Sequence, residues 1–120
     1  MADHYVTITG FDHYYDLTPF KISNLIRCSK EPDNQYDGEA IRCSLPQIGT
    51  VGYLANSPST LAGGTRSAGR VYDHVPDKFY VRVCFTTRTK VICRIEESLS
   101  PQQLDAELVE QLRKEDDWTD

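Results

Sequence analysis

Tyrosine and aspartate side chains concentrate in two loop-like segments, where they could hold a flat and charged ligand. Tyr14 and Tyr15 lie in a polar stretch near the N-terminus, and Tyr36 and Asp37 lie in residues 30–41, KEPDNQYDGEAI. A loop tyrosine can stack on a nucleic-acid base, and a carboxylate can accept a hydrogen bond from a sugar hydroxyl group. The same tyrosines could instead close the ends of a hydrophobic core, and composition favours neither role over the other.

Residues suited to catalysis are present without the spacing that catalysis requires. The three histidines, His4, His13 and His74, lie outside any nucleophile or zinc-protease motif. The glycine-rich stretch 61–69, LAGGTRSAG, lacks the lysine and the flanking pattern of a phosphate-binding loop. The sequence therefore predicts no catalytic residues and no enzymatic activity.

Metal and cofactor binding are not favoured either. Four acidic residues crowd the turn-rich stretch without the spacing of a calcium loop: Glu31, Asp33, Asp37 and Glu39. The four cysteines form no Cys-x-x-Cys pair: Cys28, Cys43, Cys84 and Cys93. Three of these cysteines lie in apolar, strand-like runs, so we expect reduced thiols in the core and predict neither metal nor cofactor.

Charge is distributed unevenly along the chain. The net charge is −5, yet residues 96–120 hold nine acidic residues against two basic ones, which leaves residues 1–95 slightly basic. The first part could therefore bind an anion, whereas the tail could not. No segment has the length of a membrane span, and the N-terminus lacks the pattern of a secretory signal, so we predict a cytoplasmic protein.

The elements that must position these residues are mostly short strands. Six segments have the alternating or apolar pattern of β-strands: residues 5–9, 22–28, 39–45, 50–55, 79–86 and 90–95. A hairpin is expected where residues 87–89 join the last two segments. An asparagine or serine before Pro58 predicts a short helix that ends at Gly63 or Gly64, and residues 65–78 are expected to form a loop with at most one helical turn.

A helix is expected near the end of the sequence. Ser100, Pro101 and Gln103 have the order of a capping box, in which two side chains bond each other's backbone amides. Four apolar residues then recur at helical spacing: Leu104, Leu108, Val109 and Leu112. Together these elements predict a mainly β fold, a six-stranded OB-like or SH3-like small barrel with two short helices and a C-terminal amphipathic helix. We expect the barrel domain in residues 1–96 and an acidic helix and tail in residues 97–120.

The order of three motifs resembles the HIRAN domain family. The sequence has GFDHYY at residues 10–15, KEPDNQYDGEAI at 30–41 and GTVGYLA at 49–55. At these places the family shares G…YY, then R/K-E/D-P-x-N-x-Y-D-x-x-A-I, then I/V-G-Y or I/V-G-H. The resemblance covers roughly residues 5–95, and the chain also looks like a group of small stand-alone bacterial HIRAN proteins with no assigned activity. It implies a six-stranded, OB-like barrel with two short helices.

The resemblance also implies a function. HIRAN domains that are fused to fork-remodelling helicases recognise the 3′ end of single-stranded DNA. A similar chain would be a nucleic-acid-binding module that acts on single-stranded DNA in DNA repair or replication processing. Tyr14 and Tyr36 would grip the terminal base, and Asp37 would receive the terminal 3′-hydroxyl group. Asn34 and its neighbour Asp33 would lie where the family contacts the backbone or the phosphate groups.

Several positions differ from those fork-remodelling members. Asp33 takes the place of an asparagine, and His13 that of an arginine. Tyr53 takes the place of a histidine, and Asn56 that of a phosphate-contacting lysine. These differences remove positive charge, which normally contributes much of the affinity for nucleic acid. Basic residues elsewhere could supply phosphate contacts: Lys30, Arg66 and Arg70.

A protein-interaction module is the competing hypothesis. The barrel, or the apolar stripe Leu104, Leu108 and Leu112, could dock a partner protein or a second copy of the chain. The acidic tail could also fold over a basic surface and mimic nucleic acid. The sequence leaves the oligomeric state open.

Overall fold

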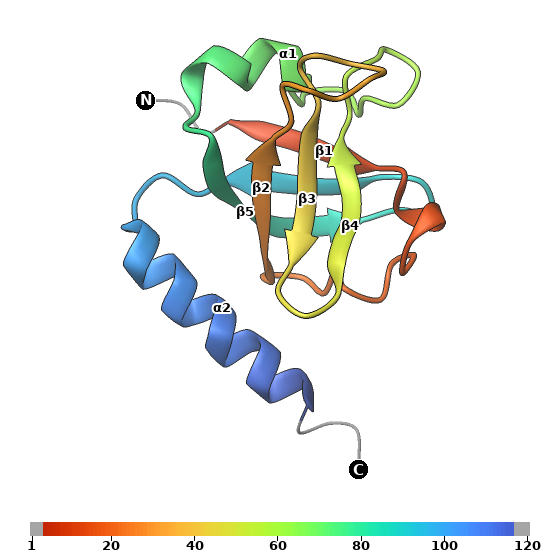
Figure 1. The fold of residues 1–120 in the computed structure, drawn as a ribbon. Helices are drawn as coiled ribbons and strands as arrows, with labels where there is room; N and C mark the ends of the chain where they lie inside the picture. The colour runs from red at the N-terminus through yellow and green to blue at the C-terminus, as the bar shows by residue number, and fades with distance from the viewer. Residues whose placement is uncertain (1–3, 117–120) are drawn as a thin grey trace.

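Six antiparallel strands close into a barrel in the computed structural model of the chain, which describes residues 4–116 (Figure 1). The strands are β1 (Tyr5–Thr9), β2 (Leu25–Lys30), β3 (Ile41–Leu45), β4 (Gly49–Leu54), β5 (Lys78–Thr86) and β6 (Val91–Ile95). Their order around the barrel is β1-β4-β3-β2-β5-β6, and the pairing of β6 with β1 completes the circle. The predicted fold class is confirmed, because the chain is a six-stranded barrel with two short helical regions and a C-terminal helix.

β2 and β3 begin later than the sequence predicted, because turns occupy the residues before them. Ser23 has a positive φ of 75°, so strand pairing starts at Leu25 rather than at the predicted Ile22. Before β3, Ala40 N donates a hydrogen bond of 3.1 Å to Asp37 O and closes the preceding turn. The connection between β2 and β3 is therefore the exposed turn that its Asp, Asn and Gly residues predicted.

β4 passes close to β1 at Gly52. A Cβ atom at this position would lie 2.8 Å from Ile8 Cγ2 and 2.9 Å from Thr9 O, which is closer than side chains approach. The register between β3 and β4 also shifts at this level. Glycine at position 52 therefore allows β4 to lie close to β1, next to the pairing of Thr9 with Tyr53.

The prediction of a short helix from Pro58 to Gly63 or Gly64 is wrong. Residues 57–60 include a turn, and the following loop is fixed to β1 by the buried Thr7. The Thr7 hydroxyl lies 2.8 Å from Thr65 Oγ1 and accepts a hydrogen bond of 3.2 Å from Ala62 N. These contacts hold the loop in a conformation that a helical hydrogen-bond ladder does not allow. The short helices are α1 (Ala68–Val71), the 3-10 turn η2 (Tyr72–His74) that continues it, and the 3-10 turn η1 (Phe11–His13).

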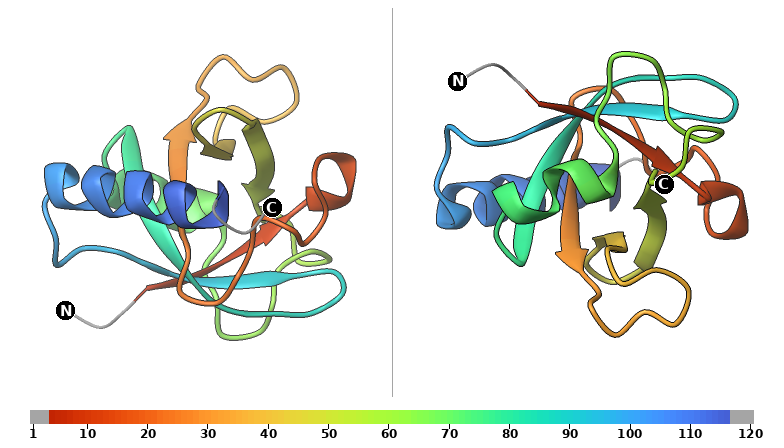
Figure 2. Two further views of the ribbon diagram at one scale, coloured as in Figure 1. Left: turned by 90° about the horizontal axis from the view of Figure 1, so that it is seen from below. Right: turned by 90° about the horizontal axis from the view of Figure 1, so that it is seen from above.

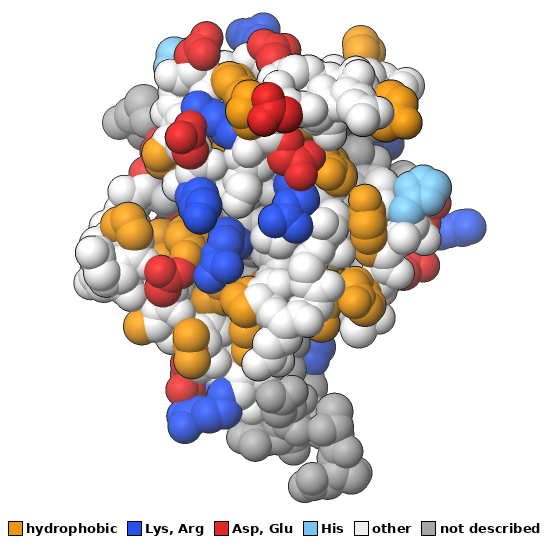
Figure 3. Space-filling view, viewed as in Figure 1, with side chains coloured by type: hydrophobic (Ala, Val, Ile, Leu, Met, Phe, Trp, Pro, Cys, Tyr) orange, Lys and Arg blue, Asp and Glu red, His pale blue; other side chains and the backbone are white. Residues whose placement is uncertain are grey.

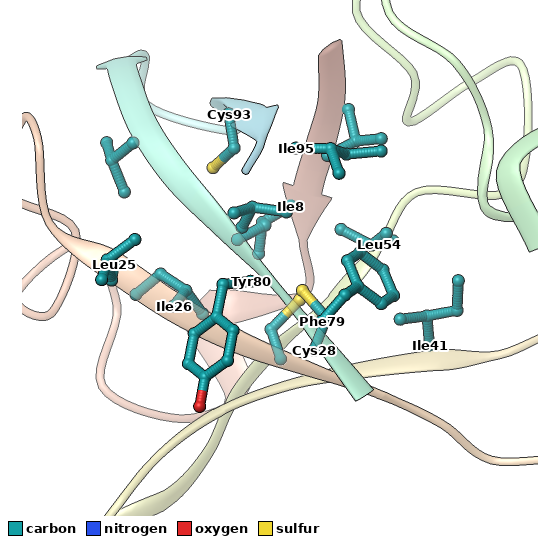
Figure 4. Packing of buried hydrophobic residues seen from close by; sticks show 14 of the residues in the cluster. Ile8, Leu25, Ile26, Cys28, Ile41, Leu54, Phe79, Tyr80, Cys93 and Ile95 are labelled. Atoms are coloured by element: carbon teal, nitrogen blue, oxygen red, sulfur yellow. The ribbon is translucent and has the colours of Figure 1, made fainter. Parts of the chain in front are cut away.

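The barrel interior is filled by aliphatic side chains, aromatic rings and thiols (Figure 4). Cys28, Cys43 and Cys93 are completely buried, as predicted. Burial is the main cause that raises the pKa of the Cys43 and Cys93 thiols, so both groups stay protonated and pack as small apolar side chains. Within residues 4–116, no group of His, Cys, Asp and Glu residues could hold a metal ion.

The C-terminal helix α2 (Pro101–Asp116) packs on the outside of the barrel against β2 (Figures 1 and 2). The predicted capping box is present, because Ser100 N donates to Gln103 Oε1 at 2.9 Å and Gln103 N donates to Ser100 Oγ at 3.2 Å. Leu104 and Leu108 are buried as predicted, but Val109 is 64% exposed because it faces away from the barrel. None of the described helices is long and apolar enough to cross a membrane.

Ion pairs hold α2 on a basic face of the barrel. Arg82 Nη1 lies 2.5 Å from Glu107 Oε2, and Arg82 Nε lies 2.6 Å from Glu96 Oε2. Arg27 Nη2 lies 3.5 Å from Asp105 Oδ1. The acidic helix therefore folds over arginines of β2 and β5, on a part of the barrel remote from the β2–β3 turn (Figure 1).

Candidate nucleic-acid interface

Asn34 builds the turn between β2 and β3. Its side-chain oxygen accepts hydrogen bonds from Tyr36 N at 2.9 Å and from Asp37 N at 3.1 Å. Asp37 Oδ1 continues the pattern by accepting from Glu39 N at 2.9 Å. These local bonds satisfy backbone amides that no strand partner reaches, and they leave the Tyr36 side chain at a position that is 94% exposed.

Glu31 connects this turn to the barrel. Its Oε1 accepts hydrogen bonds from Tyr53 OH at 2.8 Å and from Asn34 Nδ2 at 3.1 Å, and its Oε2 lies 3.6 Å from Arg42 Nε. Burial and the neighbouring Glu31 carboxylate raise the pKa of Tyr53 to about 12, so the phenol remains a hydrogen-bond donor. Sequence reasoning considered Glu31 only as a metal ligand and missed this role, although Glu31 lies inside the KEPDNQYDGEAI motif.

Asn56 ties the same turn to α1. Its Nδ2 donates to Asp37 Oδ2 at 2.8 Å, and its Oδ1 accepts from Gly69 N at 2.8 Å. A Cβ atom at position 69 would lie 2.7 Å from Oε1 of the exposed Glu39 side chain, so α1 lies close to the turn at this glycine. Each Asp37 oxygen accepts one hydrogen bond in this arrangement and keeps the capacity to accept another.

These residues surround an open hollow of about 520 Å³, which we call the tyrosine hollow. Its lining consists of Tyr14, Asn34, Tyr36, Asp37, Ala40, Tyr53, Leu54, Asn56 and Ser57. Tyr14 reaches the hollow from the segment after η1, where its amide donates to Phe11 O at 3.0 Å. Six residues that the sequence analysis placed at binding positions of the family therefore lie around one space of small-ligand size: Tyr14, Asn34, Tyr36, Asp37, Tyr53 and Asn56.

A second hollow, also of about 520 Å³, adjoins the first. Asn56 and Ser57 line both spaces, and the second is lined in addition by Arg66 and Arg70, so we call it the arginine hollow. Both arginine side chains are exposed. Arg66 N donates to Tyr5 O at 2.7 Å, which fixes this loop against β1.

Two solved structures resemble this one. The HIRAN domain of human HLTF is similar with a TM-score of 0.56 over 91% of this chain and 88% of that chain, at 14% sequence identity. The fold is therefore HIRAN-like. A protein from Lactobacillus plantarum is similar with a TM-score of 0.50 over 80% of this chain and 98% of that chain, at 22% identity. No family model and no curated protein matches the sequence. At these identities the HIRAN likeness establishes the fold alone, so the ligand is inferred from the residues of this chain.

Two residues that the sequence analysis singled out, Lys30 and His13, lie outside both hollows. Lys30 Nζ lies 4.0 Å from Asp77 Oδ1 and 4.5 Å from the centre of the Tyr72 ring, and the Lys30 side chain is only 13% exposed. His13 is exposed, and its Nε2 lies 4.0 Å from Asp12 Oδ1. Lys30 and His13 therefore line neither the tyrosine hollow nor the arginine hollow.

One side of the tyrosine hollow is acidic. Glu31 and Asp33 line a third hollow, the acidic hollow, which shares Asn34 and Tyr53 with the tyrosine hollow. Figure 3 shows acidic side chains at the upper end of this face, over α1 and the base of the β2–β3 turn, with basic side chains among them. This HIRAN-like fold thus places exposed aromatic rings next to a region that carries carboxylates and next to another that carries arginines.

Proposed function

We propose that this chain is a non-catalytic nucleic-acid-binding module, and that its tyrosine hollow holds the terminal nucleoside at the 3′ end of single-stranded DNA. The observation that carries the proposal is that Tyr14, Tyr36 and Asp37 line one open hollow. Aromatic rings that stack on bases contribute about 1 to 3 kcal/mol per base and tolerate any base. A module of this kind would serve DNA repair or replication processing.

The three residues have separate tasks in this proposal. Tyr14 and Tyr36 stack on the terminal base, because both side chains are at least 45% exposed and face the same space. Asp37 accepts a hydrogen bond from the 3′-hydroxyl group with the acceptor capacity that its bonds to Asn56 and Glu39 leave. A 3′-phosphate group would instead meet a carboxylate, and the two negative charges would repel each other.

Fluorescence anisotropy with labelled oligonucleotides tests this proposal. We expect a strand that ends in a 3′-hydroxyl group to bind more tightly than the same strand with a 3′-phosphate group, by roughly tenfold, which corresponds to one lost hydrogen bond to a charged group. A strand whose 5′ end alone is phosphorylated is the control for added charge. Equal binding of the two 3′ ends, or no binding of either, would remove the proposal.

Docking of a protein on the apolar stripe of α2 has less support. Leu104 is 3% exposed and Leu108 is 0% exposed, because both belong to the core cluster of the barrel. Two of the three residues of the stripe are thus covered by the chain itself, and Leu112 is half-buried. The acidic helix pairs with Arg27 and Arg82, whereas the arginine hollow is left open.

A further inference from the structure

We propose that a bound strand leaves the tyrosine hollow in one direction, across Asn56 and Ser57 into the arginine hollow, where Arg66 and Arg70 hold the phosphate groups of its last two linkages. The inference rests on the proposed function, because it requires a nucleic-acid end in the tyrosine hollow. It adds the path of the backbone, the residues that bind phosphate, and a recognised length of two to three nucleotides.

The two hollows form one continuous surface. Asn56 and Ser57 belong to the lining of both, and each hollow measures about 520 Å³. Each volume lies within the range of sites for small ligands, so the pair has room for more than one nucleotide. Asn56 is held from both sides, by Asp37 and by Gly69, so the wall that the strand must cross is already fixed.

Arg66 and Arg70 are available to bind an anion. Five other arginines lie in ion pairs: Arg27, Arg42, Arg82, Arg94 and Arg113. Among the residues that the structure describes, no carboxylate pairs with Arg66 or Arg70, and both side chains are exposed. A guanidinium group presents five N–H donors in a planar fork that matches phosphate oxygens.

The backbone beneath these arginines is well anchored. Arg66 N donates to Tyr5 O at 2.7 Å, and Ser67 Oγ accepts from Arg70 N at 3.3 Å. Ala68 N, between them, donates to Ala55 O at 2.9 Å. Because the loop is ordered before a ligand arrives, only the two side chains lose freedom when they bind a phosphate group, and the cost of binding is smaller.

The exit from the tyrosine hollow past Asn34 and Tyr53 disfavours a polyanion. Glu31 and Asp33 line the acidic hollow on that side. Lys30 also lines it, but its ammonium group lies 4.0 Å from Asp77 Oδ1 and is largely covered. Coulomb repulsion by the carboxylates and attraction by Arg66 and Arg70 therefore both direct the phosphate groups toward the arginine hollow.

Strands that carry one uncharged linkage test the proposed path of the nucleic-acid backbone. The full chain is mixed with 5′-labelled hexathymidylate strands, each with one phosphodiester replaced by an uncharged methylphosphonate, and affinity is measured by anisotropy. We expect about a tenfold loss when either of the last two linkages is neutral, and less than about a twofold change when the linkage next to the label is neutral. Arg66→Ala and Arg70→Ala should each make the dependence of log affinity on log salt shallower by about 0.7.

Arg88→Ala is the matched control, because Arg88 is an exposed arginine in the β5–β6 turn that lines neither hollow. It should bind every strand as the unchanged chain does. A loss that is equal at all linkages, or an effect of Arg88→Ala as large as that of Arg66→Ala, would overturn the path. Binding that depends on Tyr36 but not on Arg66 or Arg70 would overturn the inference and leave the proposed function. No binding of any strand would overturn both.

Discussion

Asn56 and Asp37 are joined by a hydrogen bond of 2.8 Å from the asparagine amide to the aspartate Oδ2, although 19 residues separate them in the sequence. The same asparagine accepts a hydrogen bond from Gly69 N. One side chain thus links the β2–β3 turn to α1, orients the carboxylate that faces the tyrosine hollow, and forms the wall between this hollow and the arginine hollow.

Asn56→Asp should destabilise the protein at pH 7. The variant replaces the donor to Asp37 with a second carboxylate, so a hydrogen bond becomes a repulsion between like charges. We expect the free energy of unfolding in urea to fall by about 1 to 3 kcal/mol. Gln35→Glu adds the same charge at an exposed position of the same turn and should leave stability nearly unchanged. Equal stability of the two variants would contradict the role given to Asn56.

Tyr36→Ala separates binding from folding. The side chain is 94% exposed, so its removal should leave the urea midpoint unchanged. Affinity for a single strand with a 3′-hydroxyl group should fall by about 1 to 3 kcal/mol, and Tyr36→Phe should retain most of it because the ring remains. Tyr15→Ala is the control, since Tyr15 is exposed but bonds to Ile48 O outside the hollow. Similar losses for Tyr15 and Tyr36 would contradict a specific stacking site.

Tyr53 should ionise later than an ordinary tyrosine. Its pKa in the folded chain is about 12, raised from 10.0 by burial and by Glu31. The stability that this shift contributes is therefore complete below pH 10, and it is lost as the pH rises from 10 through 12. Absorbance near 295 nm, recorded within seconds of a pH jump, should show a tyrosinate step near pH 12 that Tyr53→Phe removes. Glu31→Gln should move this step to lower pH. If Tyr53→Phe instead removed a step centred at pH 10, the assignment would be contradicted.

Leu108→Ala and Val109→Ala should differ sharply, although the two residues are neighbours in α2. Leu108 is completely buried in the core cluster, so its truncation should lower the free energy of unfolding by about 2 to 5 kcal/mol. Val109 is 64% exposed, and its truncation should change stability by less than about 0.5 kcal/mol. Chemical unfolding of both variants measures the difference. Comparable losses would mean that α2 does not pack as the structure shows.

Glu107→Gln should weaken the attachment of α2 to the barrel. It should also make the free energy of unfolding less sensitive to a fall in pH. The hydrogen bond from Arg82 lowers the pKa of Glu107, so the stability contributed by this ion pair is present above pH 4.5 and lost as the pH falls below it. The carboxylate is 40% exposed and screened by solvent, so we expect a loss of about 1 kcal/mol at pH 7. The loss should vanish near pH 3. Glu110→Gln is the control, because Glu110 pairs with Arg113 inside the same helix.

Local patterns predicted most of the barrel. The alternation of residues 79–86 and 90–95 predicted the last hairpin, which closes where Thr87 N donates to Lys90 O at 2.8 Å. The capping box at Ser100 was also correct, since its bonds span three residues. The helix over residues 58–63 failed because local capping signals do not report that the hydroxyl of Thr7, 55 residues from Ala62, holds the loop against β1.

By itself, the sequence determined the turn of residues 30–41, because the bonds that Asn34 makes to Tyr36 and Asp37 reach only two and three positions along the chain. Tertiary structure alone decided which side chains meet this turn. Glu31 and Tyr53 are 22 residues apart in the sequence, and their hydrogen bond exists because β2, β3 and β4 lie side by side in the closed barrel. Tertiary structure also pairs Arg27, Arg42 and Arg82 with carboxylates that are distant in the sequence and leaves Arg66 and Arg70 exposed beside the tyrosine hollow, since these pairings depend on distance in space.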